Sequence, residues 1–397
     1  MRRCASVLCL LAAALAAAGC LGPPALHHAV LGYDETISRL EHEMLLLNIA
    51  RTDQNLPPHF TVTSAIAATF DYRTTVGIGG SWLVASLATA PGVNSYNVSL
   101  GASAAENPTL SIVPVQGEEF TRRVLGPMAE SKFEFLVFQG APIDMVLRLM
   151  ADGIELQTPD GRFERFVLNW SSRPAEYEEF RRRVLHLAWL NATRRLFVGA
   201  LAFEETLPVT LTAPPTAAEV MGALDKGLRW TRADGGWELR RSVTGRVAIT
   251  NYDPRTLSDE ARQALNARAS ANPANFVLVD IRPGHPGGDF PLFGAFKLRS
   301  LNVMLAFAAA SIHRLPELDV APDPRTGPPA RNPRRTLAIE VTETASPGSS
   351  PRVAYGGRHY AVADTPWDRE AFTLLSQLFQ MTVTDVSKTG VPITISK

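Results

Sequence analysis

Apolar and polar residues alternate through FDYRTTVGIGGSWLV (Phe70–Val84), and the alternation returns in SYNVSLGASA (Ser95–Ala104). The even-numbered positions carry the large apolar side chains, whereas the odd-numbered positions are mainly Gly, Ser, Thr and Asn. A period of two sustained over this length is typical of β-strands, because successive side chains of a strand point to opposite faces. Two such runs in succession predict an antiparallel β-hairpin over 70–104, and this hairpin dominates the predicted fold.

The hairpin has two interpretations. In the first, it belongs to a soluble sheet whose even face packs on a core. In the second, it lies in an outer membrane. Tyr72 and Trp82 are ten residues apart, which corresponds to about 33 Å of strand and, at ~45° tilt, to a height of about 24 Å. This height is close to the ~25 Å apolar band of outer-membrane strands. Phe70 and Tyr72 mark one end of that band, and Trp82 and Tyr96 lie near the other. Lipid tolerates no open strand edge, so the second interpretation requires hairpins from several subunits.

The N-terminus has the sequence features of a secretory signal peptide. Arg2 and Arg3 precede an uncharged run that ends in Ala18-Gly19-Cys20, and the run is too short for a membrane-spanning helix of about 20 apolar residues. The ending resembles the lipobox of bacterial lipoproteins. This resemblance implies that Cys20 is acylated and anchors the protein to membrane lipid. In enterobacterial-type lipoproteins a residue such as Leu21 after the cysteine implies sorting to the outer membrane.

Composition excludes several classes of protein. The three cysteines are Cys4, Cys9 and Cys20, so the predicted mature domain has no disulfide and no cysteine-based metal site. At 46% hydrophobic and 20% charged residues the chain is globular rather than disordered. The full chain has 39 basic and 39 acidic residues. Removal of residues 1–19 takes away Arg2 and Arg3 and leaves 37 basic and 39 acidic residues. Nucleic acid is therefore not an expected partner.

Helices and hairpins mix without regular βαβ alternation, which predicts an α+β fold of antiparallel hairpins packed with helices. The predicted segments are a lipoprotein signal peptide (1–19), a tether (20–32), a helix with the long hairpin (33–157), a central helical and α+β region (158–315), a Pro-rich linker (316–335) and a small C-terminal α+β module (336–397). Helices are predicted over 34–51, 118–128, 142–151, 174–203, 216–228, 258–269, 298–313 and 367–379. Further strands are predicted over 109–115, 133–138, 276–281, 336–341 and 381–386, with hairpins over 230–241 and 352–363.

No constellation of catalytic residues emerges. His42-Glu43 begins like the zincin motif, but that motif needs a second histidine where Leu46 stands. His285 lies in RPGHPGGD (Arg282–Asp289), a loop dense in polar groups that a turn-rich connector explains equally well. We therefore predict no catalytic residue, no metal ligand and no cofactor, and expect a protein that is not an enzyme.

Four strings resemble a group of uncharacterised proteobacterial lipoproteins of similar length. They are Leu45–Arg51 (LLLNIAR), Asn107–Thr109 (NPT), Gln116–Phe120 (QGEEF) and Tyr355–Tyr360 (YGGRHY). The resemblance implies an envelope location and supplies no activity. A lipid anchor combined with a hairpin also resembles the logic of oligomeric lipoprotein secretion channels such as the curli exporter, although no motif matches.

These observations favour an outer-membrane lipoprotein that faces the periplasm and serves as a non-enzymatic scaffold or assembly component of a cell-envelope system. Envelope proteins, or further copies of the chain, are its expected partners. The alternative is a subunit of an oligomeric outer-membrane export pore that contributes the hairpin 70–104. A hydrolase acting on envelope polymers is a distant third hypothesis.

Overall fold

The computed structural model describes residues 22–80, 96–115, 117–344, 351–383 and 393–396. Contacts divide the chain into two units, which are residues 1–58 with 120–382 and residues 59–119 with 383–397. Helices and largely antiparallel sheets make this an α+β protein, as predicted. The unit boundaries differ from the predicted segments, because the hairpin separates from the helix before it and residues 120–157 belong to the larger unit.

The smaller unit contains the predicted hairpin. β1 (Thr61–Gly80) and β2 (Tyr96–Pro114) pair antiparallel, and from Ala65 to Gly80 the register sets even residues opposite even ones, as in Val76↔Leu100. Directly opposed residues share a face of a sheet, so the two alternations are in phase. β13 (Ile393–Ser396) pairs antiparallel with Thr109–Ile112 of β2.

Two strand predictions near this unit need correction. The strand predicted over 109–115 is confirmed as β-structure from Thr109 to Pro114, but it continues β2 instead of forming another strand. Residues 381–383 of the predicted strand 381–386 are the end of a helix, and the rest of it lies outside the described residues. The strand that does form near the C-terminus is β13.

A seven-stranded sheet forms the centre of the larger unit, with the order β4-β3-β9-β8-β7-β5 and with β6 paired to β7. Neighbouring strands are antiparallel except for β7 and β8, which run parallel. The strands are β3 (Ala151–Gln157), β4 (Phe163–Leu168), β5 (Phe197–Leu211), β6 (Leu228–Ala233), β7 (Gly236–Thr250), β8 (Phe276–Ile281) and β9 (Leu292–Leu298).

Helices pack on this sheet and bury their apolar residues. Ser258 and Ser300 accept hydrogen bonds from the first turns of α8 and α9, and Pro174 occupies the first turn of α6, where its missing N–H is harmless. The helices and helical turns of this part are η1 (Thr121–Leu125), α4 (Glu130–Phe138), α5 (Ile143–Met150), α6 (Pro174–Ala192), η2 (Pro254–Thr256), α8 (Asp259–Ser270) and α9 (Leu301–Ile312). A single turn, α3 (Gly117–Phe120), precedes η1.

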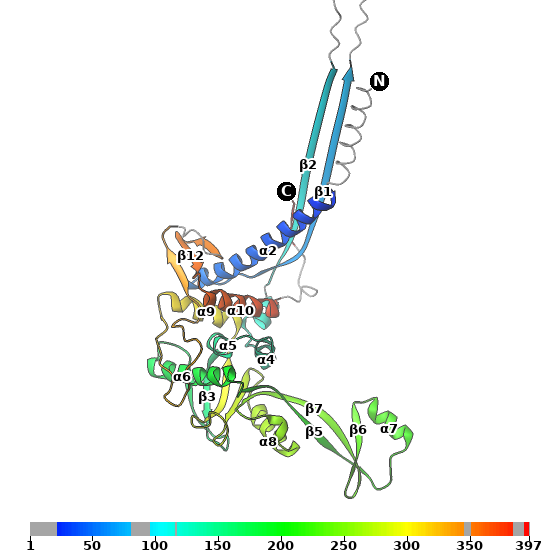
Figure 1. The fold of residues 1–397 in the computed structure, drawn as a ribbon, viewed down its shortest axis with the longest axis vertical. Coiled ribbons are helices and arrows are strands. Elements are labelled where there is room, and N and C mark those ends of the chain that lie inside the picture. Colours follow the sequence, from blue (N-terminus) through cyan, green and yellow to red (C-terminus); the bar gives the residue numbers. More distant parts are fainter. Residues whose placement is uncertain (1–21, 81–95, 116, 345–350, 384–392, 397) are drawn as a thin grey trace, which may run out of the picture. The chain divides into compact units, whose positions relative to one another are not determined.

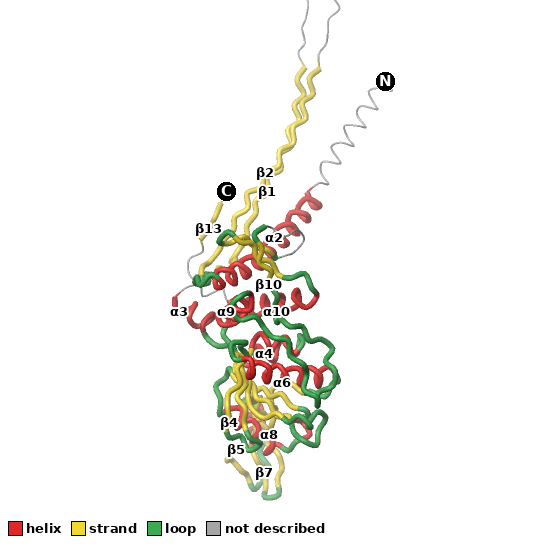
Figure 2. Tube along the Cα trace, turned by 90° about the vertical axis from the view of Figure 1, so that its left-hand side faces the viewer, coloured by secondary structure: helices red, strands yellow, loops and turns green. Residues whose placement is uncertain are grey.

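A second, small sheet in the same unit has the order β10-β12-β11 and lies near α2, α9 and α10 (Figure 2). Its strands are β10 (Ile339–Thr342), β11 (Arg352–Tyr355) and β12 (Arg358–Val362). α2 (Gly22–Asp53) contacts α9 and β11, and Tyr360 donates its hydroxyl to Asp53 at 3.0 Å. α10 (Pro366–Val383) buries Phe372, Leu375 and Leu378.

β5 and β7 continue side by side beyond the helices and reach β6 and α7 (Ala217–Leu224), as Figure 1 shows. Thr216 and Glu219 form a reciprocal capping box at the start of α7. The predicted hairpin at Asp234-Gly235-Gly236 is confirmed as the β6–β7 turn.

Three further predictions are corrected in the larger unit. Residues 133–138 form helix α4 rather than a strand, because Phe133 and Leu136 are buried with helical spacing whereas Phe135 and Phe138 are exposed. The helix predicted over 174–203 ends at Ala192, after which Arg194 takes φ +58° and β5 begins. The predicted linker 316–335 lies inside this unit, where Glu317 and Val320 are buried.

Candidate functional site

The site residues expected from sequence are distributed unevenly over the structure. Cys20, Leu21 and Trp82 lie outside the described residues. Phe70 and Tyr72 lie in β1, and Tyr96 is the first residue of β2, directly opposite Gly80. Tyr72 and Gly80 are eight residues apart, which corresponds to about 27 Å of strand. The register therefore keeps Phe70 and Tyr72 at one level of the hairpin and Tyr96 at another.

Charged residues end at one level of both strands. Asp71 and Arg73 are the charged residues of β1, and Glu106 is the charged residue of β2, whereas residues 61–70 and 107–114 carry no charge. The register pairs Phe70 with Glu106 and Arg73 with Ser103, so the three charges lie within a few residues of the same level. Beyond that level the 32 residues from Thr74 to Ala105 include no Asp, Glu, Lys, Arg or His.

The backbone edges of the hairpin are largely unpaired. β13 covers β2 only at Thr109–Ile112, and in the part of the chain that the structure describes no strand other than β2 pairs with β1. A strand edge with free N–H and C=O groups is a template for another strand. The hairpin is therefore the first candidate functional site, and its chemistry is that of backbone pairing.

The loop around His285 is held in place as a connector. Asn251 donates its side-chain amide to the carbonyl oxygens of Arg282 and Pro286 at 2.9 and 3.0 Å. His186 Nε2 lies 3.0 Å from the carbonyl oxygen of Gly287, and a Cβ on Gly287, whose φ is +75°, would lie 2.5 Å from Leu190 Cδ2. The ring of His285 packs against Tyr252, with centroids 5.2 Å apart. These contacts hold the backbone and the His285 ring of the loop in place, as a structural connector requires.

A cluster of charged and phenolic groups lies at the end of β8, next to this loop. Asp280 is fully buried and accepts hydrogen bonds from Tyr252 Oη, from Arg282 Nε at 2.6 Å and from Arg268 Nη1 at 3.3 Å. Burial, and then the Asp280 carboxylate, raise the pKa of Tyr252. Each oxygen of Asp280 is thus occupied by a donor, and the phenol beside it holds its proton, so the cluster offers neither a free base nor an activated nucleophile.

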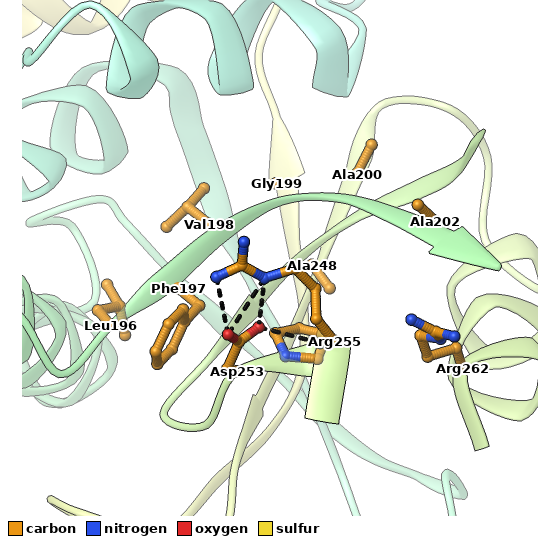
Figure 3. A pocket seen from close by; sticks show the side chains of 11 residues that line it. Leu196, Phe197, Val198, Gly199, Ala200, Ala202, Ala248, Asp253, Arg255 and Arg262 are labelled. Atoms are coloured by element: carbon orange, nitrogen blue, oxygen red, sulfur yellow. Dashed lines mark hydrogen bonds and ion pairs between the residues drawn. The ribbon is translucent and has the colours of Figure 1, made fainter. Parts of the chain in front are cut away.

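A cavity of about 420 Å³ lies between β5, η2 and α8 (Figure 3). Its wall from β5 is made of small and apolar residues, including Val198, Gly199 and Ala200. Arg255 is paired with Asp253 at 2.8 Å and Arg262 with Asp259 at 2.6 Å, so acidic partners already neutralise both cations. Asp253 is the carboxylate of this lining, and its pairing with Arg255 occupies it, while the lining residues include no histidine, cysteine or serine.

A buried ionic network fastens the segment 316–335 to the core. Glu317 accepts hydrogen bonds from Tyr177 Oη at 2.8 Å and from Thr336 N at 2.6 Å, and it faces Arg148 Nη2 at 3.4 Å. Burial alone would raise the pKa of Glu317, but Arg148 and the Thr336 hydrogen bonds outweigh it, so this pKa lies below its ordinary value. Burial raises the pKa of Tyr177 to about 12. Both oxygens of Glu317 and every side-chain nitrogen of Arg148 have partners, which indicates a structural role.

The described ranges contain no group of three His, Cys, Asp or Glu side chains able to hold a metal ion. Of the helices that the structure describes, none has the length and apolar content needed to cross a membrane. Comparison with protein-family models, curated proteins and solved structures finds no match for this chain.

The sequence interpretation overlooked two features of the site. The charge boundary at Asp71, Arg73 and Glu106 was readable as the limits of a long uncharged run, but its alignment on both strands required the register. The pairing of β13 with β2 joins residues about 280 positions apart, and no local pattern predicts contacts of that separation.

Proposed function

We propose that this chain is an outer-membrane lipoprotein, anchored through Cys20 and facing the periplasm, that acts without catalysis as an assembly component of a cell-envelope system. One observation carries the proposal: among the residues that the structure describes, no strand pairs with the outer edges of the hairpin β1–β2 over most of its length. An isolated two-stranded sheet is marginal in water, so such a hairpin gains stability when a further strand pairs with it. The signal-peptide features of the N-terminus and the position of Cys20 support the membrane-anchored location.

The test compares the lipidated chain with a variant in which residues 65–110 are replaced by a short Gly-Ser turn. Both proteins are extracted from the outer-membrane fraction in detergent and sized. We expect the full chain to form a defined assembly larger than one copy, alone or with an envelope protein, and the variant to be monomeric. A variant that shortens the β6–α7 turn region instead, between Thr212 and Ala233, is the matched control and should keep the assembly. A full chain that remains a monomer in the membrane extract would contradict the proposal.

A second candidate function is supported by the charge pattern of the hairpin. The uncharged stretch Thr74–Ala105, with apolar residues at even and small polar residues at odd positions, fits strands that face lipid on one side and water on the other. In this version the assembly is an export pore, and several hairpins form its wall. The detergent-extracted assembly would then conduct ions in a planar bilayer, whereas a scaffold would not. Conductance that persists after the hairpin is replaced would exclude the hairpin as the wall.

A further inference from the structure

The chain treats its exposed strand edges in two different ways. At the edge of the seven-stranded sheet, Ala200 and Glu204 of β5 donate their backbone N–H groups to the carboxylates of Glu134 and Asp259, at 2.7 and 3.0 Å. These carboxylates occupy donors that an incoming strand would need, which is a recognised way to prevent edge-to-edge pairing. The edge of β5 is therefore protected by the chain's own side chains.

The hairpin has comparable protection only at its base. There the register of β1 shifts between Thr63 and Ala65, β2 contains Pro108, and β13 covers Thr109–Ile112. A bulge, a proline and a covering strand are each devices that block edge pairing. Beyond the charge boundary, Thr74–Gly80 and Tyr96–Ala105 contain no charged residue and no proline. The bulge, the proline and the covering strand thus all lie at or below the level of the Ala68↔Pro108 pair, and the uncharged stretch beyond Asp71, Arg73 and Glu106 has none of them.

The hairpin of each copy has two outer edges, one along β1 and one along β2. The two strands are antiparallel, so the two edges run in opposite directions. We propose that the uncharged edge of β1 (Thr74–Gly80) in one copy pairs with the uncharged edge of β2 (Tyr96–Ala105) in the next copy. This inference rests on the assembly role proposed for the hairpin, and its partner is a second copy of this chain.

The head-to-tail arrangement follows from the need to leave no edge open. If β1 paired with β1 of a partner, the dimer would be twofold symmetric and both β2 edges would stay exposed. Pairing β1 with β2 repeats the same contact around a ring and satisfies every edge when the ring closes. A strand from a different protein would satisfy one edge and leave the other, so a second copy is the occupant that both edges favour.

Cysteine cross-linking tests the pairing, because Cys20 is the only cysteine beyond residue 9 and its sulfur is acylated in the anchored protein. Thr75→Cys places a thiol on β1, and four single variants place one on β2, namely Asn97→Cys, Ser99→Cys, Gly101→Cys and Ser103→Cys. Two lipidated chains with different tags are co-expressed, one carrying the β1 cysteine and the other carrying one of the β2 cysteines. The outer membranes are then isolated and oxidised. Covalent dimers are expected with at least one β1–β2 combination and with no variant alone. Thr206→Cys, on the protected strand β5, replaces the β1 variant as the matched control and should give no dimer.

Sizing of the same membrane extracts separates the two proposals. Dimers of Thr75→Cys with itself would overturn the head-to-tail pairing in favour of a twofold contact. The absence of every β1–β2 dimer in extracts that still contain the assembly would also overturn it, while leaving the assembly role intact. A monomeric extract that gives no cross-link would overturn both.

Discussion

Replacing Glu317 with alanine is expected to release the segment 316–335 from the core of the larger unit. Glu317 is 1% exposed, and its carboxylate accepts hydrogen bonds from Tyr177 and Thr336. The same carboxylate compensates Arg148, which is also 1% exposed. Arg148 in turn donates to the carbonyl oxygens of Pro333 and Arg334, so both ends of the segment depend on this pair.

The expected loss is large because one buried charge would remain without its partner. Removing one member of a buried ion pair costs about 3–5 kcal/mol of unfolding free energy. Asp319→Ala is the matched control, because Asp319 lies in the same segment but is 79% exposed and 3.7 Å from Arg334. An exposed pair of this kind contributes about 0–1 kcal/mol.

Two measurements follow the loss. Urea unfolding monitored by tryptophan fluorescence reports on Trp367, whose ring centre lies 5.4 Å from the guanidinium carbon of Arg148. Limited trypsin digestion reports on the segment itself, because Arg325 and Arg331 lie within it. We expect Glu317→Ala to lower the urea midpoint and accelerate cleavage, and Asp319→Ala to change neither. Equal, small effects of the two variants would refute the argument that Glu317 fastens this segment.

The same pair predicts a direction of pH dependence. The pKa of Glu317 is lower in the folded chain than its ordinary value of 4.5. A carboxyl group of this kind stabilises the folded state fully above its unfolded pKa, and the contribution is lost as the pH falls through the folded pKa. Wild-type stability should therefore decline below about pH 4.5, and in Glu317→Gln this part of the decline should be absent.

Three further outcomes are expected. Cys20→Ala should abolish labelling by radioactive palmitate and release the protein from the outer-membrane fraction, and Leu21→Asp should reduce outer-membrane sorting; palmitate incorporation into Cys20→Ala would refute the anchor. Burial lowers the pKa of His186, so wild-type stability should fall as the pH drops below about 6.5, where the unfolded chain binds the extra proton, and His186→Phe should flatten urea midpoints measured between pH 7 and pH 5. His285→Ala should leave assembly and any export phenotype unchanged, because its loop is a connector; loss of function at normal abundance would revive a catalytic role.

Local patterns predicted a good part of the fold. The alternation in β1 and β2 predicted the hairpin, Ser258 predicted the start of α8, and Gly356-Gly357 predicted the turn between β11 and β12. Each of these signals acts between residues close in sequence, where side-chain period, helix capping and turn geometry decide the outcome. The α+β class followed from the mixture of such elements.

Non-local contacts were beyond the reach of these patterns. The seven-stranded sheet joins β3 to β9, strands separated by more than 130 residues. The segment 316–335 resembled a linker because its prolines and polar residues give no apolar pattern, yet Tyr177 and Glu317 meet across 140 positions and fix it. Attachment through satisfied buried polar groups leaves no periodic signal in the sequence. The spacing of the hairpin aromatics could be predicted from the sequence. That Asp71, Arg73 and Glu106 lie at nearly the same height of the hairpin became known only from the strand register.

The odd-numbered positions of the hairpin distinguish its two interpretations better than the even ones. Both a protein core and lipid select apolar residues on the even face, so that face decides nothing. A face in bulk water has no physical reason to exclude charge, and β7 in the larger unit carries Glu238, Arg240 and Arg241 along its partly exposed length. In the hairpin, the odd positions from Thr75 to Ser103 are free of charge. A narrow aqueous lumen lined by many copies of one chain would multiply any charge at such a position by the number of copies, and like charges at close range repel. The uncharged odd face is therefore a feature that the second candidate function, the pore, explains and that a soluble sheet does not require. Thr75→Lys tests this directly, because it should be silent in a soluble hairpin and should change the ion selectivity of a pore.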